Sequence, residues 1–472
     1  MINIPSSLPE PIASNGPAHN SIHPFFRGSS IHHLPVELLD MIFDMVANSR
    51  PSWPIIDDIR LPTGFPHSVA SVCQHWKDVM LHNPRFWTRF SVFVGPSNPT
   101  PSSDLRSWLK ASRKLPINVH VMRGADDMQI MPDSAERESV RVRAVMDILK
   151  PHLQRCTSLT FQLLHRSSLP SLCDDIGGLP KVRVLILQCE DGAPNNFDNP
   201  ALDPRVYGTN VELERPLEFP ELMHLEIDGP NFKKASHAND DWLKQQPHAE
   251  DLFVRLSYFR PADSEIEWML EILQDATCLF FSHIELSHWE LESYPPEGSI
   301  DLDQLALLYV ENLEDLFLEG VMSQASMPNL QELGVRACSL SAFNEAFDAP
   351  LIITNLRLAG IDDWRELARF LLDDWDGDAL YLDQCAGFND VLIEVLCRCI
   401  AVARTQPLSP PLYLLSRLEI ANCTNFSIAK LRQLVETIGH RTLHVKISGS
   451  LIPRVEDEAW LIGNTRSFNW EI

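Results

Sequence analysis

Several features of extracellular and nucleic-acid-binding proteins are missing from this sequence of 472 residues. Its ten cysteines include no C-x-x-C spacing, and the closest pair is Cys397 and Cys399, so neither a zinc site nor a disulfide framework is expected. Basic residues are few. Because 39 Lys and Arg stand against 64 Asp and Glu, the net charge of -25 repels phosphate backbones and anionic lipids. We therefore expect no nucleic-acid or membrane partner.

Long apolar runs and a secretory leader are missing as well. The richest late apolar run, residues 391–403, is interrupted by Glu394 and Arg398 and falls short of the roughly 18 uncharged residues that a membrane span requires. Residues 1–20 are broken by prolines and have neither a basic start nor an apolar segment. These absences favour a location in the cytoplasm or the nucleus.

The common motifs of catalytic and cofactor sites are not found. His-Glu-x-x-His, Gly-x-Ser-x-Gly and Gly-x-x-x-x-Gly-Lys are all absent, so metal-dependent hydrolysis, acyl transfer and phosphate binding lack their usual residues. Asp374, Asp376 and Asp378 imitate the start of a calcium loop. However, the glycine comes two positions early, and Cys385 stands where the loop needs Glu. We expect no metal, no cofactor and no enzyme activity.

Residues 34–94 have the pattern of a compact helical domain. Pro35 suits the first turn of a helix that should end before Pro51, and apolar residues follow at three- and four-residue steps. The first apolar stripe consists of Leu38, Leu39, Ile42, Phe43 and Val46, and the second of Val69, Val72, Cys73, Trp76, Val79 and Met80. Phe86 and Trp87 add a bulky anchor, and residues 90–94 have the composition of a short strand.

The motifs of this segment closely resemble an F-box. The matching strings are Leu34-Pro-x-Glu-Leu-Leu-x-x-Ile-Phe43, Val69-Ala-Ser-Val-Cys-Gln-x-Trp76 and Asn83-Pro-Arg-Phe-Trp87. The resemblance implies that the helices dock on the Skp adaptor of an SCF-type cullin ubiquitin ligase, while the rest of the chain holds the substrate. The adaptor-binding residues that it implies, some of which belong to the core, are Leu34, Pro35, Leu38, Leu39, Ile42, Val72, Cys73 and Trp76.

One segment departs from the shortest F-boxes. Residues 50–66 form a longer insert, which resembles the elongated version frequent in fungal F-box proteins and leaves the fit to the adaptor open. Residues 1–30 are rich in Pro and Ser and poor in apolar residues, so they are expected to be disordered. The turn-rich segment 95–103 predicts a linker, with a domain boundary near residue 100.

The C-terminal part of the chain repeats one frame, aliphatic-x-x-aliphatic-x-aliphatic. The frame begins at Val182, Leu222, Phe281, Leu313, Leu330, Ile353 and Leu415, and a shortened copy begins at Leu380. Proline precedes several copies, polar residues alternate with the aliphatic ones, and amphipathic helices are expected between copies, as at 264–276 and 362–372. The frame resembles a leucine-rich repeat with irregular spacing, which implies a parallel sheet. An ordinary α/β domain is the alternative.

These patterns predict an α/β protein in which an N-terminal helical F-box is followed by a degenerate leucine-rich-repeat-like α/β solenoid. The parts are a disordered segment (1–30), the F-box (31–94), a linker with bridging helices and a strand (95–155) and a substrate-binding repeat domain (156–472). The expected function is that of a non-catalytic substrate-recognition adaptor of an SCF-type cullin-RING ligase. One alternative is an F-box-like scaffold outside any ligase, and a minor one is an enzyme with its active site in the C-terminal domain.

A substrate surface follows from strand alternation. If the aliphatic residues of each frame point into the core, the residues between them share one solvent-facing side of the sheet. Its middle is expected to be acidic and its end basic, which predicts a groove for a basic segment of a protein substrate. The middle comprises Glu226, Asp228, Asp251, Phe253, Glu285, Asp315, Phe317, Glu319 and Glu332, and the end comprises Arg336, Arg357, Arg417 and Lys446. A solvated surface that merely follows the net charge is the alternative.

Overall fold

A computed structural model describes residues 34–48, 65–124, 134–190, 217–243, 252–287, 300–344, 353–405, 412–439, 443–449 and 454–471. These residues form two compact units, of which the first holds 34–48 and 65–82 and the second holds the described residues from 83 onward. The segment 1–30, and the insert 50–66 apart from its last two residues, lie outside the described residues.

The first unit is a helical cluster of α1 (Val36–Asn48), α2 (His67–Ala70) and α3 (Gln74–His82). The first expected helix is confirmed, and the carbonyl of Pro35 accepts hydrogen bonds from the N–H groups of Leu38 and Leu39. The second expected helix is interrupted between α2 and α3, where the N–H of Trp76 lies 3.5 Å from the Sγ of Cys73. The spacing therefore predicted helical structure here but missed the break, and of the second apolar stripe only Val79 and Met80 are buried.

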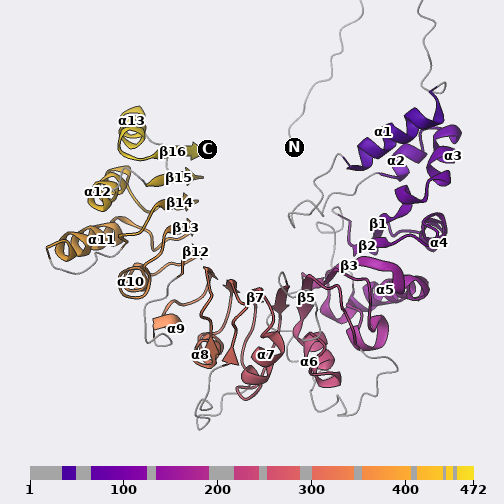
Figure 1. The fold of residues 1–472 in the computed structure, drawn as a ribbon, viewed down its shortest axis with the longest axis horizontal. Helices are drawn as coiled ribbons and strands as arrows, with labels where there is room; N and C mark the ends of the chain where they lie inside the picture. Colours follow the sequence, from indigo (N-terminus) through magenta and orange to yellow (C-terminus); the bar gives the residue numbers. More distant parts are fainter. Residues whose placement is uncertain are drawn as a thin grey trace, which may run out of the picture. The chain divides into compact units, whose positions relative to one another are not determined.

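The second unit is built on a 14-stranded sheet in which all the pairings are parallel and the strands lie in the order of the chain, as Figure 1 shows. The strands are β1 (Arg89–Phe93), β2 (Ile117–Met122), β3 (Cys156–Leu163), β4 (Val184–Cys189), β5 (His224–Asp228), β6 (Phe253–Ser257), β7 (Cys278–Ser282), β9 (Leu307–Glu311), β11 (Glu332–Arg336), β12 (Asn355–Ala359), β13 (Ala379–Asp383), β14 (Arg417–Ala421), β15 (His444–Ser448) and β16 (Ser467–Glu471). β8 (Ile300–Asp301) and β10 (Ala325–Ser326) form a separate two-stranded pair. The expected α/β class with a parallel sheet is confirmed.

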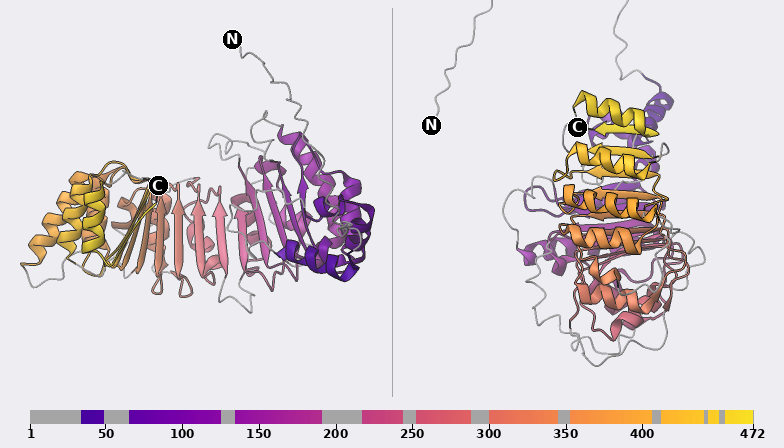
Figure 2. Two further views of the ribbon diagram at one scale, coloured as in Figure 1. Left: turned by 90° about the horizontal axis from the view of Figure 1, so that it is seen from above. Right: turned by 90° about the vertical axis from the view of Figure 1, so that its left-hand side faces the viewer.

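Helices of this unit lie along one face of the sheet (Figure 1), and Figure 2 shows α10–α13 side by side. The helices are α4 (Ser102–Ala111), α5 (Ala135–Leu149), α6 (Gly229–Ala238), α7 (Glu265–Leu273), α8 (Asp315–Gln324), α9 (Ser341–Asn344), α10 (Trp364–Arg369), α11 (Asp390–Ala403), α12 (Ile428–Ile438) and α13 (Val455–Asn464). We call the opposite side of the sheet the helix-free face, in the sense that none of these helices covers it. No helix within the described ranges has both the length and the apolar character needed to cross a membrane.

The same turn closes eight successive strands of the sheet. The residue that directly follows each strand has a left-handed backbone with φ between 49° and 64°. Its N–H donates a hydrogen bond of 2.8–3.2 Å to the carbonyl of the last residue of the next strand. The eight residues are Tyr258, His283, Asn312, Ala337, Gly360, Gln384, Asn422 and Gly449. Only two of them are glycine, so the left-handed turn cannot be predicted from the residue type at this position.

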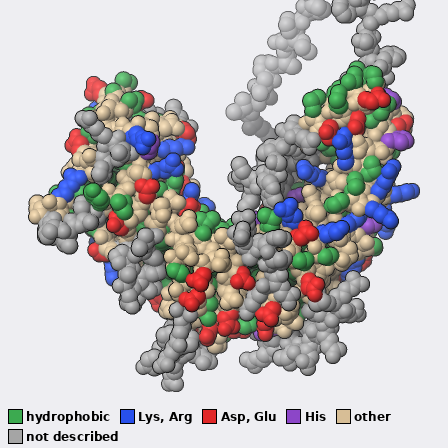
Figure 3. Space-filling view, viewed as in Figure 1, with side chains coloured by type: hydrophobic (Ala, Val, Ile, Leu, Met, Phe, Trp, Pro, Cys, Tyr) green, Lys and Arg blue, Asp and Glu red, His purple; other side chains and the backbone are tan. Residues whose placement is uncertain are grey.

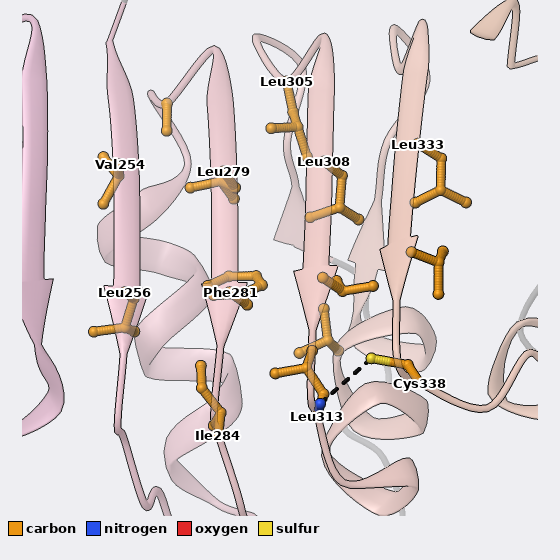
Figure 4. Packing of buried hydrophobic residues seen from close by; sticks show 14 of the residues in the cluster. Val254, Leu256, Leu279, Phe281, Ile284, Leu305, Leu308, Leu313, Leu333 and Cys338 are labelled. Atoms are coloured by element: carbon orange, nitrogen blue, oxygen red, sulfur yellow. Dashed lines mark hydrogen bonds between the residues drawn. The ribbon is translucent and has the colours of Figure 1, made fainter. Parts of the chain in front are cut away.

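The core lies between the sheet and its helices. Leu279, Leu308 and Leu333 are in register on β7, β9 and β11, and all three are almost completely buried. Figure 4 shows them in one row, with the N–H of Leu313 directed at the Sγ of Cys338 at 3.3 Å. All ten cysteines of the chain are free thiols. Each strand therefore contributes aliphatic side chains to rows that run across the sheet.

Two of the predicted frames are wrong in position. The segment 313–318 does not form a strand but enters α8, and the strand of this region is β9, with Leu308 and Val310 in the core. The frame from Phe281 begins too late, because β7 ends at Ser282. Apolar residues at steps of three and two fit the first turn of a helix as well as the end of a strand. The segment 95–155, expected to bridge two domains, contributes β2 to the same sheet.

Candidate functional site

Helix α1 of the first unit is apolar on two sides. Leu39 and Phe43 are buried, whereas Leu38, Met41 and Met45 are 41%, 56% and 64% exposed. The three exposed residues follow one another at steps of three and four, so they share one side of the helix. We call them, with the partly exposed Ile42, the α1 surface.

The buried side of α1 is fixed by α3. The rings of Phe43 and Trp76 meet edge to face, with centroids 5.0 Å apart and an interplanar angle of 64°. Val79 and Met80 of α3 are buried too. The core of this unit thus uses the Leu39 side of the helix and leaves the α1 surface in solvent. A contiguous exposed apolar area on a small unit is typical of a protein-binding site.

The residues predicted to bind the adaptor divide by exposure. Pro35, Leu38 and Val72 are exposed, and Leu39 is fully buried. The remaining four are partly exposed: Leu34, Ile42, Cys73 and Trp76. The sequence analysis did not include Met41 and Met45. Apolar residues on two sides of one helix are the signal that could have identified them, because only one side is needed for the core.

The helix-free face of the second unit carries stacked aromatic and arginine side chains. The guanidinium of Arg255 lies 4.3 Å from the ring centroid of Phe280, which in turn stacks on Tyr309 at 5.9 Å and 15°. The ring of Tyr309 also lies over Gly334, where an added Cβ would come within 2.2 Å of a ring carbon. These contacts hold the centre of this face in one arrangement.

A second group of contacts continues toward the C-terminal strands. Glu332 accepts hydrogen bonds from the hydroxyl of Tyr309 and from Nε of Arg357, the latter at 2.5 Å. Burial and Glu332 together raise the pKa of Tyr309, so the hydroxyl keeps its proton. Arg357 lies 4.2 Å over the ring of Tyr381, whose hydroxyl accepts a hydrogen bond of 3.2 Å from Arg417. Carboxylates here serve as partners of side chains on the same face.

The predicted acidic surface does not form around Glu226 and Asp228. Glu226 is 1% exposed, and its carboxylate lies 2.7 Å from Nε2 of His224 and 3.8 Å from Arg255. Asp228 is also buried, and it accepts a hydrogen bond of 2.8 Å from Asn231. Burial raises the pKa of Asp228. Neither carboxylate can therefore attract a partner from solvent.

The remaining residues of the predicted surface lie in different places. Asp315, Phe317 and Glu319 belong to α8 and not to the sheet, and Phe317 is completely buried. Glu285 follows β7 and forms an ion pair of 2.6 Å with Arg260. Phe253 does lie on the helix-free face, but it is stacked on His224 at 4.4 Å, and Asp251 is outside the described residues. The surface was expected to be continuous because two frames were assigned to the wrong segments.

The basic end of the predicted surface is present. Side chains on β11, β12, β14 and β15 are partly to largely exposed on the helix-free face: Arg336, Arg357, Arg417 and Lys446. Among the described residues, no group of three or more His, Cys, Asp or Glu is placed to hold a metal ion. The two candidate sites are thus an exposed apolar surface on α1 and a strand face rich in guanidinium groups. In the comparisons we made, neither a protein-family model nor a curated protein matches this chain.

Proposed function

We propose that this chain is a non-catalytic substrate-recognition adaptor of an SCF-type cullin-RING ubiquitin ligase. Helices α1–α3 act as an F-box that docks on the Skp adaptor, and the second unit binds a protein substrate. The observation that carries the proposal is the α1 surface, an exposed apolar side on a helix whose other side already packs on α3. It coincides with the segment whose motifs resemble an F-box.

The second unit is, in this proposal, a leucine-rich-repeat-like solenoid. Three observations support this assignment: the strands lie in the order of the chain, the same left-handed turn follows eight of them, and the helices lie on one face. Repeats of this kind contact mainly their neighbours and leave a long strand face open for a partner. The irregular spacing of the strands fits a degenerate form of the repeat.

The mechanism requires no reaction within this chain. An adaptor that holds a ligase with one unit and a substrate with another raises the effective concentration of one for the other. The chemical step, transfer of ubiquitin to a lysine, belongs to the ligase. The chain contributes two binding surfaces, and it acts in the cytoplasm, the nucleus or both.

The α1 surface supplies the decisive test. We expect that Leu38→Ala combined with Ile42→Ala lowers recovery of the Skp adaptor in a pull-down with the full chain. Each aliphatic side chain that becomes buried on docking contributes about 1.5 kcal/mol, so the pair should weaken the complex roughly a hundredfold. The affinity of the variant for purified adaptor gives the magnitude, and circular dichroism shows whether its helices are intact.

A matched control changes two exposed aliphatic residues elsewhere. Val455→Ala with Ile462→Ala removes comparable apolar surface from α13, where both side chains are exposed, and should leave recovery unchanged. Equal recovery by wild type and the α1 variant would contradict the F-box assignment. Recovery of the adaptor without any cullin would instead favour a scaffold that acts outside a ligase.

A further inference from the structure

Three arginines over the C-terminal strands extend further into solvent than the carboxylates paired with them, and Lys446 forms an ion pair of 3.0 Å with Glu471, which is 51% exposed. The side chains of Arg336, Arg357 and Arg417 are 58%, 48% and 53% exposed, and that of Lys446 is 40% exposed. They lie on β11, β12, β14 and β15, at positions that alternate with buried aliphatic residues, so all four occupy the helix-free face. Figure 3 shows Lys and Arg side chains along the strand side of this part of the chain. We call these four residues the basic surface.

The carboxylates paired with these arginines lie deeper than the guanidinium groups. Glu311 and Glu332 are 19% and 12% exposed, and they lie 3.5 Å from Arg336 and 2.5 Å from Arg357. Arg417 makes a longer contact, of 4.0 Å, with the half-buried Glu419. Each guanidinium has five N–H donors, and these contacts occupy only part of them. The basic surface therefore keeps donors directed at solvent even though the chain as a whole is acidic.

Small residues lie beside each arginine of the basic surface. In the register of the sheet, Arg336 is opposite Ala359, Arg357 is opposite Gly334, and Arg417 is opposite Ala379. The alanines opposite Arg336 and Arg417 leave those sides without a bulky side chain, whereas the ring of Tyr309 occupies the space over Gly334 opposite Arg357. Three steps between strands separate Arg357 from Lys446, which corresponds to about 14 Å. An extended segment of about five residues spans that distance.

We propose that the basic surface binds an acidic segment of a partner protein, with Asp or Glu carboxylates accepting hydrogen bonds from the arginines. Charge complementarity carries this choice, because the exposed charges at the centre of this surface are guanidinium groups that form bidentate contacts with carboxylates. A long nucleic acid fits less well, since the net charge of -25 repels an extended polyanion. The proposal names the substrate class of the adaptor and in that sense rests on the proposed function. It reverses the basic segment expected from the sequence.

Fluorescence anisotropy with the full chain tests this proposal. The probe is a labelled peptide of about 12 residues with Glu at alternate positions, long enough to cross the four strands, and peptides with Gln or Lys at those positions are the comparisons. We expect tighter binding of the Glu peptide at low salt. Arg336→Gln, Arg357→Gln and Arg417→Gln combined should lower its affinity roughly tenfold or more.

Two further variants separate recognition from general charge and from misfolding. Lys110→Gln, Arg143→Gln and Lys181→Gln together change the net charge by the same amount at exposed sites outside the basic surface, and they should leave the affinity unchanged. Replacing the three arginines by lysine keeps the charge but removes the bidentate contacts, so the affinity should fall between those of the wild type and the Gln variant. Equal losses in the two Gln variants, equal binding of the Gln peptide, or tighter binding of a single-stranded oligonucleotide would each overturn the proposal. None of these results depends on binding of the Skp adaptor. Failure of the basic surface would therefore leave the F-box proposal for the α1 surface untouched.

Discussion

His120 of β2 is held in its neutral form within the folded protein. Burial disfavours the imidazolium, and nearby Arg89 adds to the effect, so that the pKa falls from the usual 6.5 to about 4. Within the described part of the chain, its buried Nδ1 has no hydrogen-bond partner. The histidine therefore gains nothing from a proton in the folded state, whereas in the unfolded chain it takes one up near its ordinary pKa.

The sign of the pH effect follows from this shift. Since the folded pKa lies below the unfolded pKa, stability falls as the pH decreases from about 6.5 to about 4, where the unfolded chain binds the extra proton. His120 alone should account for about 2 kcal/mol of lost stability between pH 7 and about pH 5. His120→Asn should remove this part of the dependence, and urea unfolding at both pH values measures it. If wild type and variant lost the same stability over that range, His120 would not be buried as described.

At the scale of elements, glutamate side chains on helices accept hydrogen bonds from backbone N–H groups of neighbouring loops. Glu314 at the start of α8 accepts a hydrogen bond of 2.7 Å from the N–H of Leu286, and Glu366 of α10 accepts one of 3.0 Å from Leu340. Glu138 of α5 does the same for two N–H groups of the segment after β3. Part of the large acidic content of the chain therefore satisfies backbone groups that the turns would otherwise leave unpaired.

The contribution of one such hydrogen bond to stability can be measured at Glu366. Glu366→Ala leaves the N–H of Leu340 without its acceptor and should cost about 1–2 kcal/mol of unfolding free energy, whereas Glu366→Gln keeps an acceptor oxygen and should cost less. Glu271→Ala, at an exposed position of α7, is the matched control and should change little. Chemical denaturation gives all three values. An equal cost for the Ala and Gln variants would assign the effect to charge and not to the hydrogen bond.

The elements themselves were largely predictable, because most copies of the aliphatic frame encode a strand. The frames at Val182, Leu222, Leu330 and Ile353 coincide with β4, β5, β11 and β12, and α10 lies within the helix expected at 362–372. The failures have a common cause. Periodicity indicates which residues are buried but not whether a strand or a helix buries them, so it predicts a strand where α8 forms.

The candidate sites were only partly predictable for a different reason. That α1 carries an apolar stripe follows from spacing, but the division between Leu39 inside and Leu38 outside depends on where Trp76 packs. On the helix-free face, the residues of each strand follow from the alternating pattern, but the register that pairs Arg357 with Glu332 does not. Strand alternation therefore predicted an acidic middle and a basic end, whereas pairing across strands buries Glu226 and leaves Arg357 more exposed than its partner Glu332.

At the scale of the whole second unit, sheet order determines how instability spreads. Each strand pairs only with the strands that precede and follow it among those of the 14-stranded sheet, so contacts are mostly between neighbours. Such arrays behave nearly as one-dimensional chains of coupled repeats, in which an end can open while distant repeats stay folded. The two ends of the sheet should therefore respond independently to mutations in their cores.

Hydrogen exchange followed by mass spectrometry can test this independence. Ile447→Ala truncates a fully buried side chain of β15, costs about 3 kcal/mol and should speed exchange in β14–β16 while β2–β5 keep their protection. Val119→Ala, at an equally buried position of β2, should produce the reverse pattern. Uniform acceleration across all strands in either variant would mean that the sheet opens as one cooperative unit. Independent ends would instead let the basic surface over β11–β15 order on its partner without any change in β2–β5.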